Sequence, residues 1–325
     1  MQLSRLRMAL AAALMLAGSA QAQAQDVVRL GILKQSHFGA VAYIKEIAPG
    51  CGIRVEEKTY TRGPGLMDAI RAGELDVGAG ASDTAVTGRA GGAPIFIVAG
   101  IAKGGLRLLA RPGQSIRNLQ GLKGKKVGVA PGGIEEVLLA AGLQDAGLSL
   151  DSVPGRDVLL VYLPPSALNA ALAGRKIDAM IQSEPLASQA IIKGQAVEVL
   201  KPYETAVGEP VRVLFMTEAF YHRKRTLAEK FMRCFVEATK TFVGDPALAE
   251  LYMRTVVFQG ELSSSDFREA IVNTPYAYSV SARHIQVTTD SMVRTGLAPA
   301  GKAPLAREWV RTDLLEAAKK SVGVK

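Results

Sequence analysis

Polar or glycine-containing segments follow four apolar runs of the sequence, and they hold the residues best able to bind a small molecule. The four segments contain Ser36, His37 and Phe38; Ser82, Asp83 and Thr84; Gly132, Gly133 and Ile134; and Glu184. Each lies where a predicted strand ends and the chain turns into a helix. In open α/β sheets, ligands bind at the carboxyl ends of the strands, so we expect the four segments to meet around one site.

The first two segments allow a binding role and a structural one. Ser36 and His37 could turn backbone N–H groups and side chains to a ligand, or Ser36 could cap a helix beside a solvent-exposed histidine. Phe38 could stack on a flat ligand or cover the core. Asp83, between Ser82 and Thr84, could hold a cationic or amide group of a ligand, or serve only as a helix cap.

The glycine segment and the acidic segment point to different ligand chemistries. Gly132 and Gly133 permit close backbone approach, and the free N–H groups of the helix that begins at Ile134 attract anions. No hydroxyl follows the glycines, however, and Glu135 and Glu136 bring negative charge to the first turn. Both facts weaken the case for a sulfonate, sulfate or nitrate.

Glu184 ends an apolar run and precedes Pro185. If its carboxylate faced Asp83 across a cleft, the two acids would suit an amine or an amino-heterocycle. The alternative is a salt bridge from Glu184 to an arginine or lysine.

Catalytic and metal-binding patterns do not occur in the sequence. The three histidines, His37, His222 and His284, lie outside any H-E-x-x-H spacing, and no G-x-S-x-G or phosphate-binding Walker loop is found. We therefore expect no enzyme activity, no cofactor and no metal site. Cys51 and Cys234 could form a disulfide in an oxidising compartment, whereas the apolar run around Cys234 favours a small buried side chain.

The elements that position these segments alternate between strand and helix. Predicted strands at 27–33, 54–60, 75–79, 95–99 and 106–110 are followed by a second series at 126–130, 158–163 and 177–181, and by one at 211–216. This order predicts an α/β fold with mostly parallel sheets flanked by helices. We expect a first lobe from 25–107, a second lobe from 108–210, and a return to the first lobe over 211–325 that ends in a helix at about 305–320 containing Trp309.

The N-terminal segment predicts export. Arg5 and Arg7 precede the short apolar run Met8–Ala17, and small residues follow up to Ala24, as in a signal peptide covering 1–24. No cysteine follows that region, so we expect no lipid anchor. The formal net charge is +9, but the basic residues are scattered and are not interleaved with aromatic residues, which argues against a nucleic-acid partner.

The stretch Ser115–Val129, S-I-R-N-L-Q-G-L-K-G-K-K-V-G-V, resembles the entry into the second lobe of the NMT1-like periplasmic solute-binding proteins. These proteins serve ABC importers of sulfonates, nitrate, taurine and thiamine precursors. The segments Gly73–Gly78, Gly91–Ile95 and Ser183–Pro185 are similar to other family patterns.

The resemblance implies the two-lobe periplasmic-binding-protein fold of type II, with a small organic solute in the cleft. It also implies a periplasmic location, an ABC permease with its cytoplasmic ATPase as partner, and a monomeric state. Two alternatives stay open: a binding protein that serves a sensory receptor, and an enzyme similar to the thiamine-pyrimidine synthases, whose cysteine-rich motif is absent here.

Overall fold

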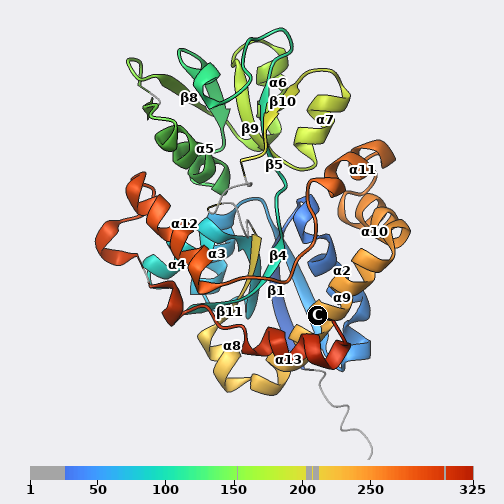
Figure 1. Ribbon diagram of the computed structural model, residues 1–325. Helices are drawn as coiled ribbons and strands as arrows, with labels where there is room; N and C mark the ends of the chain where they lie inside the picture. The colour runs from blue at the N-terminus through green and yellow to red at the C-terminus, as the bar shows by residue number, and fades with distance from the viewer. Residues whose placement is uncertain (1–25, 152, 203–206, 208–211, 304, 325) are drawn as a thin grey trace, which may run out of the picture.

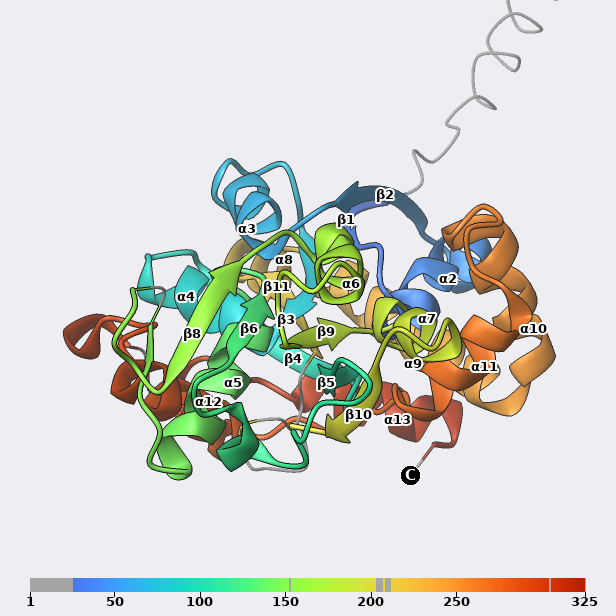
Figure 2. The same cartoon turned by 90° about the horizontal axis from the view of Figure 1, so that it is seen from above.

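The computed structural model describes residues 26–325, except 152, 203–206, 208–211, 304 and 325, so the expected signal peptide at 1–24 lies outside the described residues. Two separate β-sheets, each flanked by helices, form an upper and a lower lobe (Figure 1). Seen from above, the upper lobe lies over the strand ends of the lower one (Figure 2). The predicted α/β class is confirmed.

The lower sheet has the order β2-β1-β3-β11-β4. Its strands are β1 (Val27–Leu33), β2 (Arg54–Tyr60), β3 (Val77–Ala81), β4 (Ile95–Ala102) and β11 (Arg212–Thr217). β1 pairs in parallel with β2 and β3, while β11 inserts antiparallel between β3 and β4. Every residue of β4 is buried, which fits its nearly continuous apolar sequence.

The upper sheet has the order β10-β5-β9-β6-β8-β7. Its strands are β5 (Leu106–Ala110), β6 (Lys126–Val129), β7 (Leu150–Asp151), β8 (Val158–Tyr162), β9 (Ala179–Ser183) and β10 (Val197–Leu200). β6, β7, β8 and β9 pair in parallel, whereas β5 is antiparallel to both β9 and β10. In each sheet a single strand, β11 in the lower one and β5 in the upper one, runs against all the others, so both sheets are mostly parallel, as predicted.

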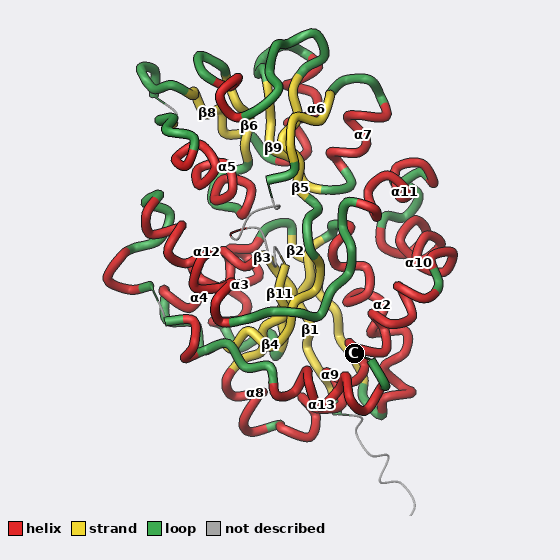
Figure 3. The backbone as a smooth tube through the Cα atoms, viewed as in Figure 1, coloured by secondary structure: helices red, strands yellow, loops and turns green. Residues whose placement is uncertain are grey.

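Helices cover both lobes, and each described helix is too short or too polar to cross a bilayer. The upper lobe carries α5 (Ile134–Asp145), α6 (Pro165–Ala173) and α7 (Leu186–Ile192). The lower lobe carries α2 (Gly39–Ile47), α3 (Gly63–Arg71), α4 (Ser82–Ala90), α8 (Glu218–Arg223), α9 (Arg225–Gly244), α10 (Pro246–Tyr252), α12 (Ala282–Arg294) and α13 (Asp313–Val322). A π-helical turn, Met253–Val257, extends α10, and α11 (Ser264–Val272) lies against α7 of the upper lobe (Figure 3).

The first passage between the lobes occupies residues 103–105, since β4 belongs to the lower sheet and β5 lies wholly in the upper one. The boundary expected after residue 107 therefore falls inside β5. Gly104 and Gly105 both have positive φ, at 66° and 79°. A Cβ on Gly105 would lie 1.8 Å from Nε2 of His37, so only glycine fits here.

The helix expected at about 305–320 begins later than predicted. Trp309 lies outside a helix: α13 begins only at Asp313, and the carbonyl oxygen of Trp309 accepts a hydrogen bond from Ile97 N at 3.0 Å. The fully buried indole thus sits where the chain runs alongside β4.

Cys51 and Cys234 form a disulfide, with their Cα atoms 5.9 Å apart. The sequence had favoured an isolated buried thiol at Cys234, because nothing local to the apolar run Phe231–Val236 indicates a partner 183 positions away. The bond ties the loop before β2 to α9. Such a bond fits a protein that folds in an oxidising compartment.

Candidate functional site

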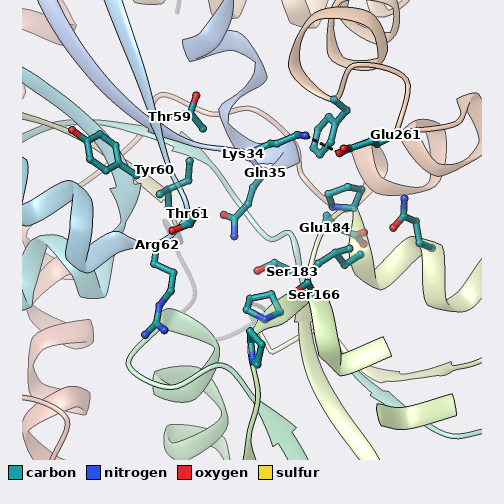
Figure 4. A pocket seen from close by; sticks show the side chains of 17 residues that line it. Lys34, Gln35, Thr59, Tyr60, Thr61, Arg62, Ser166, Ser183, Glu184 and Glu261 are labelled. Carbon is teal, nitrogen blue, oxygen red and sulfur yellow. Dashed lines mark hydrogen bonds and ion pairs between the residues drawn. The ribbon is translucent and has the colours of Figure 1, made fainter. Parts of the chain in front are cut away.

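A cavity of about 550 Å³ lies between the two lobes, within the range of small-molecule sites. Residues from both lobes line it (Figure 4). Its walls are Leu33, Lys34, Gln35, Thr59, Tyr60, Thr61, Arg62, Pro164, Pro165, Ser166, Ser183, Glu184, Pro185, Leu186, Gln189, Phe258 and Glu261. We call this space the main cavity. It collects the carboxyl ends of β1, β2, β8 and β9, as the rule for open α/β sheets requires.

The main cavity is largely apolar, with charges at its two ends. Leucines, prolines, Tyr60 and Phe258 supply the apolar wall. Lys34 and Glu261 form an ion pair at one end, 2.7 Å from Nζ to Oε2. Arg62 points toward the opposite end (Figure 4), where its Nη2 donates to the carbonyl oxygen of Pro131 at 3.2 Å across the cleft.

A smaller recess of about 70 Å³ adjoins the main cavity and shares Gln35 and Arg62 with it. Its other walls include Ala81, Asp83 and Thr84 of the lower lobe, and Pro131, Gly132, Gly133, Ile134 and Glu135 of the upper lobe. Arg212, the first residue of β11, also lines it. We call this space the recess.

A buried charge cluster stands behind the recess and joins the two lobes. Arg212 is 2% exposed; its Nη2 donates to Ser183 Oγ at 3.2 Å and lies 3.8 Å from Oε1 of Glu135. Ser183 Oγ in turn donates to Glu135. Burial lowers the pKa of Arg212 although the nearby acids oppose the shift. Arg212 also lies over the Phe38 ring, with Cζ 6.0 Å from its centroid.

Asp83 is buried beside this cluster, at 3% exposure. Burial raises the pKa of its carboxyl to about 7, and the charge of Arg212 offsets this only in part. Oδ1 of Asp83, Oε1 of Gln35 and Nε of Arg212 are buried without a hydrogen-bond partner among the described residues. Buried polar atoms are rarely left unsatisfied, so these three indicate a place for a water molecule or a ligand atom.

The turn before α5 carries its own acid. Gly132 N donates to Glu136 Oε2 at 2.6 Å, and the hydroxyl of Tyr162 donates to Oε1 of the same carboxylate at 2.6 Å. Burial, followed by this hydrogen bond, raises the pKa of Tyr162 to about 12. One backbone N–H of this turn, that of Gly132, is thus already occupied by the protein's own carboxylate, in line with the weakened case for an anion at the glycine turn.

The structure brings part of the predicted site together. Asp83, Thr84, Gly132, Gly133 and Ile134 line the recess, and Glu184 lines the main cavity. Ser82 is fully buried and lines neither space. The segments at Ser36 and Glu184 meet directly, since Ser36 N donates to the carbonyl oxygen of Glu184 at 3.4 Å.

Ser36, His37 and Phe38 do not line either space, and both interpretations of His37 were wrong. His37 is fully buried, and its Nε2 lies 2.9 Å from the carbonyl oxygen of Gly104, at the first passage between the lobes. Burial lowers its pKa well below the usual value, and the nearby Arg212 adds to the shift. The short helical turn Ser36–Phe38 therefore supports the passage.

Glu184 does not face Asp83; the alternative, a salt bridge, is what forms. Its Oε1 accepts from Arg107 Nε at 2.7 Å, and its Oε2 accepts from N and Oγ of Ser188 at 3.0 and 2.7 Å. Arg107 is 2% exposed. An amine between Glu184 and Asp83 is accordingly not supported by the geometry.

Several lining residues were missed by the sequence analysis. Thr59 and Tyr60 end β2, Thr61 and Arg62 follow it, and Pro164–Ser166 lie just after β8. Applying the strand-end rule to every strand would have found them. Phe258 and Glu261 follow the π-helical turn and carry no such signal. Arg212 carries no sequence signal either, because its partners come from distant segments.

The sequence also matches a known protein family over most of its length. The family model described as the NMT1-like family matches residues 21–256, which is most of the chain. The chain belongs to the NMT1-like family. This assignment agrees with the resemblance of Ser115–Val129, and it places the two lobes and their cleft in a known structural class.

Curated relatives match part of the chain. A putative binding protein of Brucella abortus is 32% identical over 158 residues, which are 47% of this chain and 46% of the relative. A putative aliphatic sulfonates-binding protein of Escherichia coli is 28% identical over 174 residues, 53% of this chain and 50% of the relative. The chain thus spans about half the length of the curated relatives it matches.

Solved structures share the fold over most of the chain. The alkanesulfonate-binding protein SsuA from Xanthomonas axonopodis pv. citri bound to MOPS has a TM-score of 0.72 at 20% identity, covering 88% of this chain and 98% of that one. The desulfurization enzyme DSZB has a TM-score of 0.64 at 13% identity, covering 91% and 99%. The fold is that of the periplasmic binding proteins, and it also occurs in an enzyme.

Proposed function

We propose that the protein is the extracytoplasmic solute-binding component of an ABC importer and captures a small organic solute in the main cavity. The observation that carries this proposal is the cavity itself, whose walls come from both lobes on either side of the passage at 103–105. A solute that touches both lobes favours the closed form by the contacts available only there. Membership in the NMT1-like family supports the same role.

The rest of the proposal follows from the sequence. Residues 1–24 act as a signal peptide and are removed, the mature chain works as a monomer in the periplasm without a lipid anchor, and it delivers solute to a permease with a cytoplasmic ATPase. Residues 25–107 and 211–325 form one lobe and 108–210 the other, with the first passage moved to 103–105. The protein binds without turnover, with Ser82, Asp83, Thr84, Gly132, Gly133, Ile134 and Glu184 near the solute.

A ligand screen tests the proposal. The chain from residue 25 is mixed with sulfonates, carboxylates, amines, pyrimidines and flavins, and thermal unfolding is measured. A true ligand at a hundred times its Kd adds roughly 2.7 kcal/mol to the free energy of unfolding, which raises Tm by several degrees. Small-angle scattering of the same sample should report a more compact molecule, and incubation should leave the ligand chemically unchanged.

A matched pair of variants locates the ligand. Ser166 is exposed in the wall of the main cavity, and Ser265 is an exposed serine in the first turn of α11 that does not line it. S166W should abolish binding by filling the cavity, and S265W should bind as the parent does. If S166W retains the parent affinity, the solute binds elsewhere and the proposal fails. Loss of uptake of the ligand in cells that lack the gene would distinguish transport from sensing.

A further inference from the structure

We propose that the recess holds the carboxylate of an organic acid whose apolar body occupies the main cavity. This inference rests on the proposed function and narrows its solute to one class. It starts from the charges that line the two spaces. Lys34 is paired with Glu261, and the buried Glu184 with Arg107, so each of these charges already has a partner of opposite sign.

Arg62 is the exception among the described cleft residues. Its one hydrogen bond goes to the carbonyl oxygen of Pro131, and no described carboxylate lies within ion-pair distance of it. The guanidinium stands where the main cavity meets the recess, because it lines both. An arginine in that state offers further N–H donors and a full positive charge to a ligand.

Unsatisfied buried atoms give an independent indication at the same place. Nε–H of Arg212 and the carboxyl of Asp83 belong to residues that are 2% and 3% exposed, and both residues line the recess. The amide of Gln35 lines both spaces as well, and its buried Oε1 has no partner among the described residues. Arg212 and, in its neutral form, the carboxyl of Asp83 supply donors from two separate segments of the lower lobe to one small volume.

A planar carboxylate fits this donor set better than a tetrahedral anion. A sulfonate has three oxygens and needs more donors than a carboxylate, and the N–H of Gly132 already donates to Glu136. A carboxylate has two oxygens, one for Arg62 and one for the recess. The main cavity then receives an aliphatic or aromatic body against Leu33, Leu186 and Phe258.

The titration of Asp83 gives the proposal a second signature. Arg212 of β11, Glu135 of α5, Arg62 of the loop after β2, and the Asp68–Arg71 pair of α3 surround this carboxyl. A bound carboxylate favours the neutral form of Asp83, whose pKa is about 7. Affinity for an organic acid should therefore fall, by up to tenfold per pH unit, as the pH rises above 7, with proton uptake on binding.

The test uses four probes with the same body: 3-phenylpropanoate, 2-phenylethanesulfonate, 3-phenylpropylamine and 3-phenylpropanamide. Calorimetric titration of the mature chain should find the carboxylate bound most tightly. Each added methylene of an alkanoate series should tighten binding about fourfold until the cavity is filled. R62Q should weaken the carboxylate roughly ten- to hundredfold and leave the amide unchanged, and D83N should remove the dependence on pH.

Arg54→Gln provides the matched control. Arg54 is exposed at the start of β2, the strand that precedes Arg62, and it does not line the main cavity. Equal or tighter binding of the sulfonate, the amine or the amide overturns the proposal, and so does no binding of the carboxylate at 1 mM or an R62Q variant with parent affinity. In each of those cases a different ligand that binds in the cavity and is lost in S166W would leave the proposed function standing. The proposed function itself fails only if no solute binds between the lobes.

Discussion

Two arginines buried between the lobes, Arg107 and Arg212, have opposite surroundings. Arg107 contacts Glu184 at 2.7 Å, Ser188 at 3.0 Å, Glu269 at 3.1 Å and Glu198 at 3.2 Å. Within the described part of the chain, Arg212 has one side-chain hydrogen bond, to Ser183, and its Nε has no partner. The partners of Arg107 thus satisfy its guanidinium group, whereas the partners of Arg212 leave its Nε–H donor without a hydrogen bond among the described residues.

The pKa directions agree with this difference. Burial opposes the charge of Arg107, yet its acidic partners prevail and raise its pKa. Burial lowers the pKa of Arg212, and the acids near it do not compensate. A buried ion pair contributes to stability only when its partners satisfy it fully. Arg107 is therefore a structural residue beside the first passage between the lobes, whereas the Nε–H of Arg212 has no partner among the described residues.

The largest expected effect is on the buried cluster of Arg107. Arg107→Met removes the partner of Glu184, whose side chain is buried, and leaves that carboxylate with Ser188 alone. Breaking a buried pair in this way costs about 3–5 kcal/mol, which urea unfolding would measure. Arg111→Met serves as the control, because its pair with Asp178 is about a quarter exposed on each side and should be worth less than about 1 kcal/mol. Equal losses of stability in Arg107→Met and Arg111→Met would show that the buried cluster of Arg107 contributes no more than a partly exposed pair.

The sequence predicted those features of the fold and the site that are determined by residues close together in the chain. The bounds of β1 and β2 follow from their own residues, and those strands lie where they were expected. The turn of Asp83 and the turn of Gly132 were found because each follows its own strand. The Cys51–Cys234 bond, the position of Trp309 beside β4 and the partners of Arg107 and Arg212 all join segments far apart in the chain, and no local pattern predicts them.

The next effect concerns Asp83, which lines the recess together with Arg212. Because burial raises its pKa to about 7, the stability that its neutral form allows is present below pH 4 and is lost as the pH rises through 7. Asp83→Asn cannot ionise, so relative to the parent it should gain on the order of 4 kcal/mol between pH 4 and pH 8. Urea unfolding across that range measures the difference. Asp68→Asn removes an exposed acid and should show no such gain. If the free energies of unfolding of D83N and the parent changed with pH in the same way, the raised pKa of Asp83 would be contradicted.

The smallest effect on stability, and the sharpest contrast, is expected for Arg212→Met. Methionine fills the space without a charge to desolvate, and Glu135 keeps its hydrogen bond from Ser183. Removing one partner of a buried ion pair is costly when the other charge is left uncompensated, but Glu135 lies 3.8 Å from Arg212 and keeps its hydrogen bond from Ser183. The free energy of unfolding should therefore fall by less than about 2 kcal/mol, which is less than in Arg107→Met. Affinity for 3-phenylpropanoate should nevertheless fall at least tenfold, because Arg212 lines the recess. A loss of stability as large as that of Arg107→Met, with ligand affinity intact, would mean that both arginines are structural and that the unpartnered Nε is satisfied by water alone.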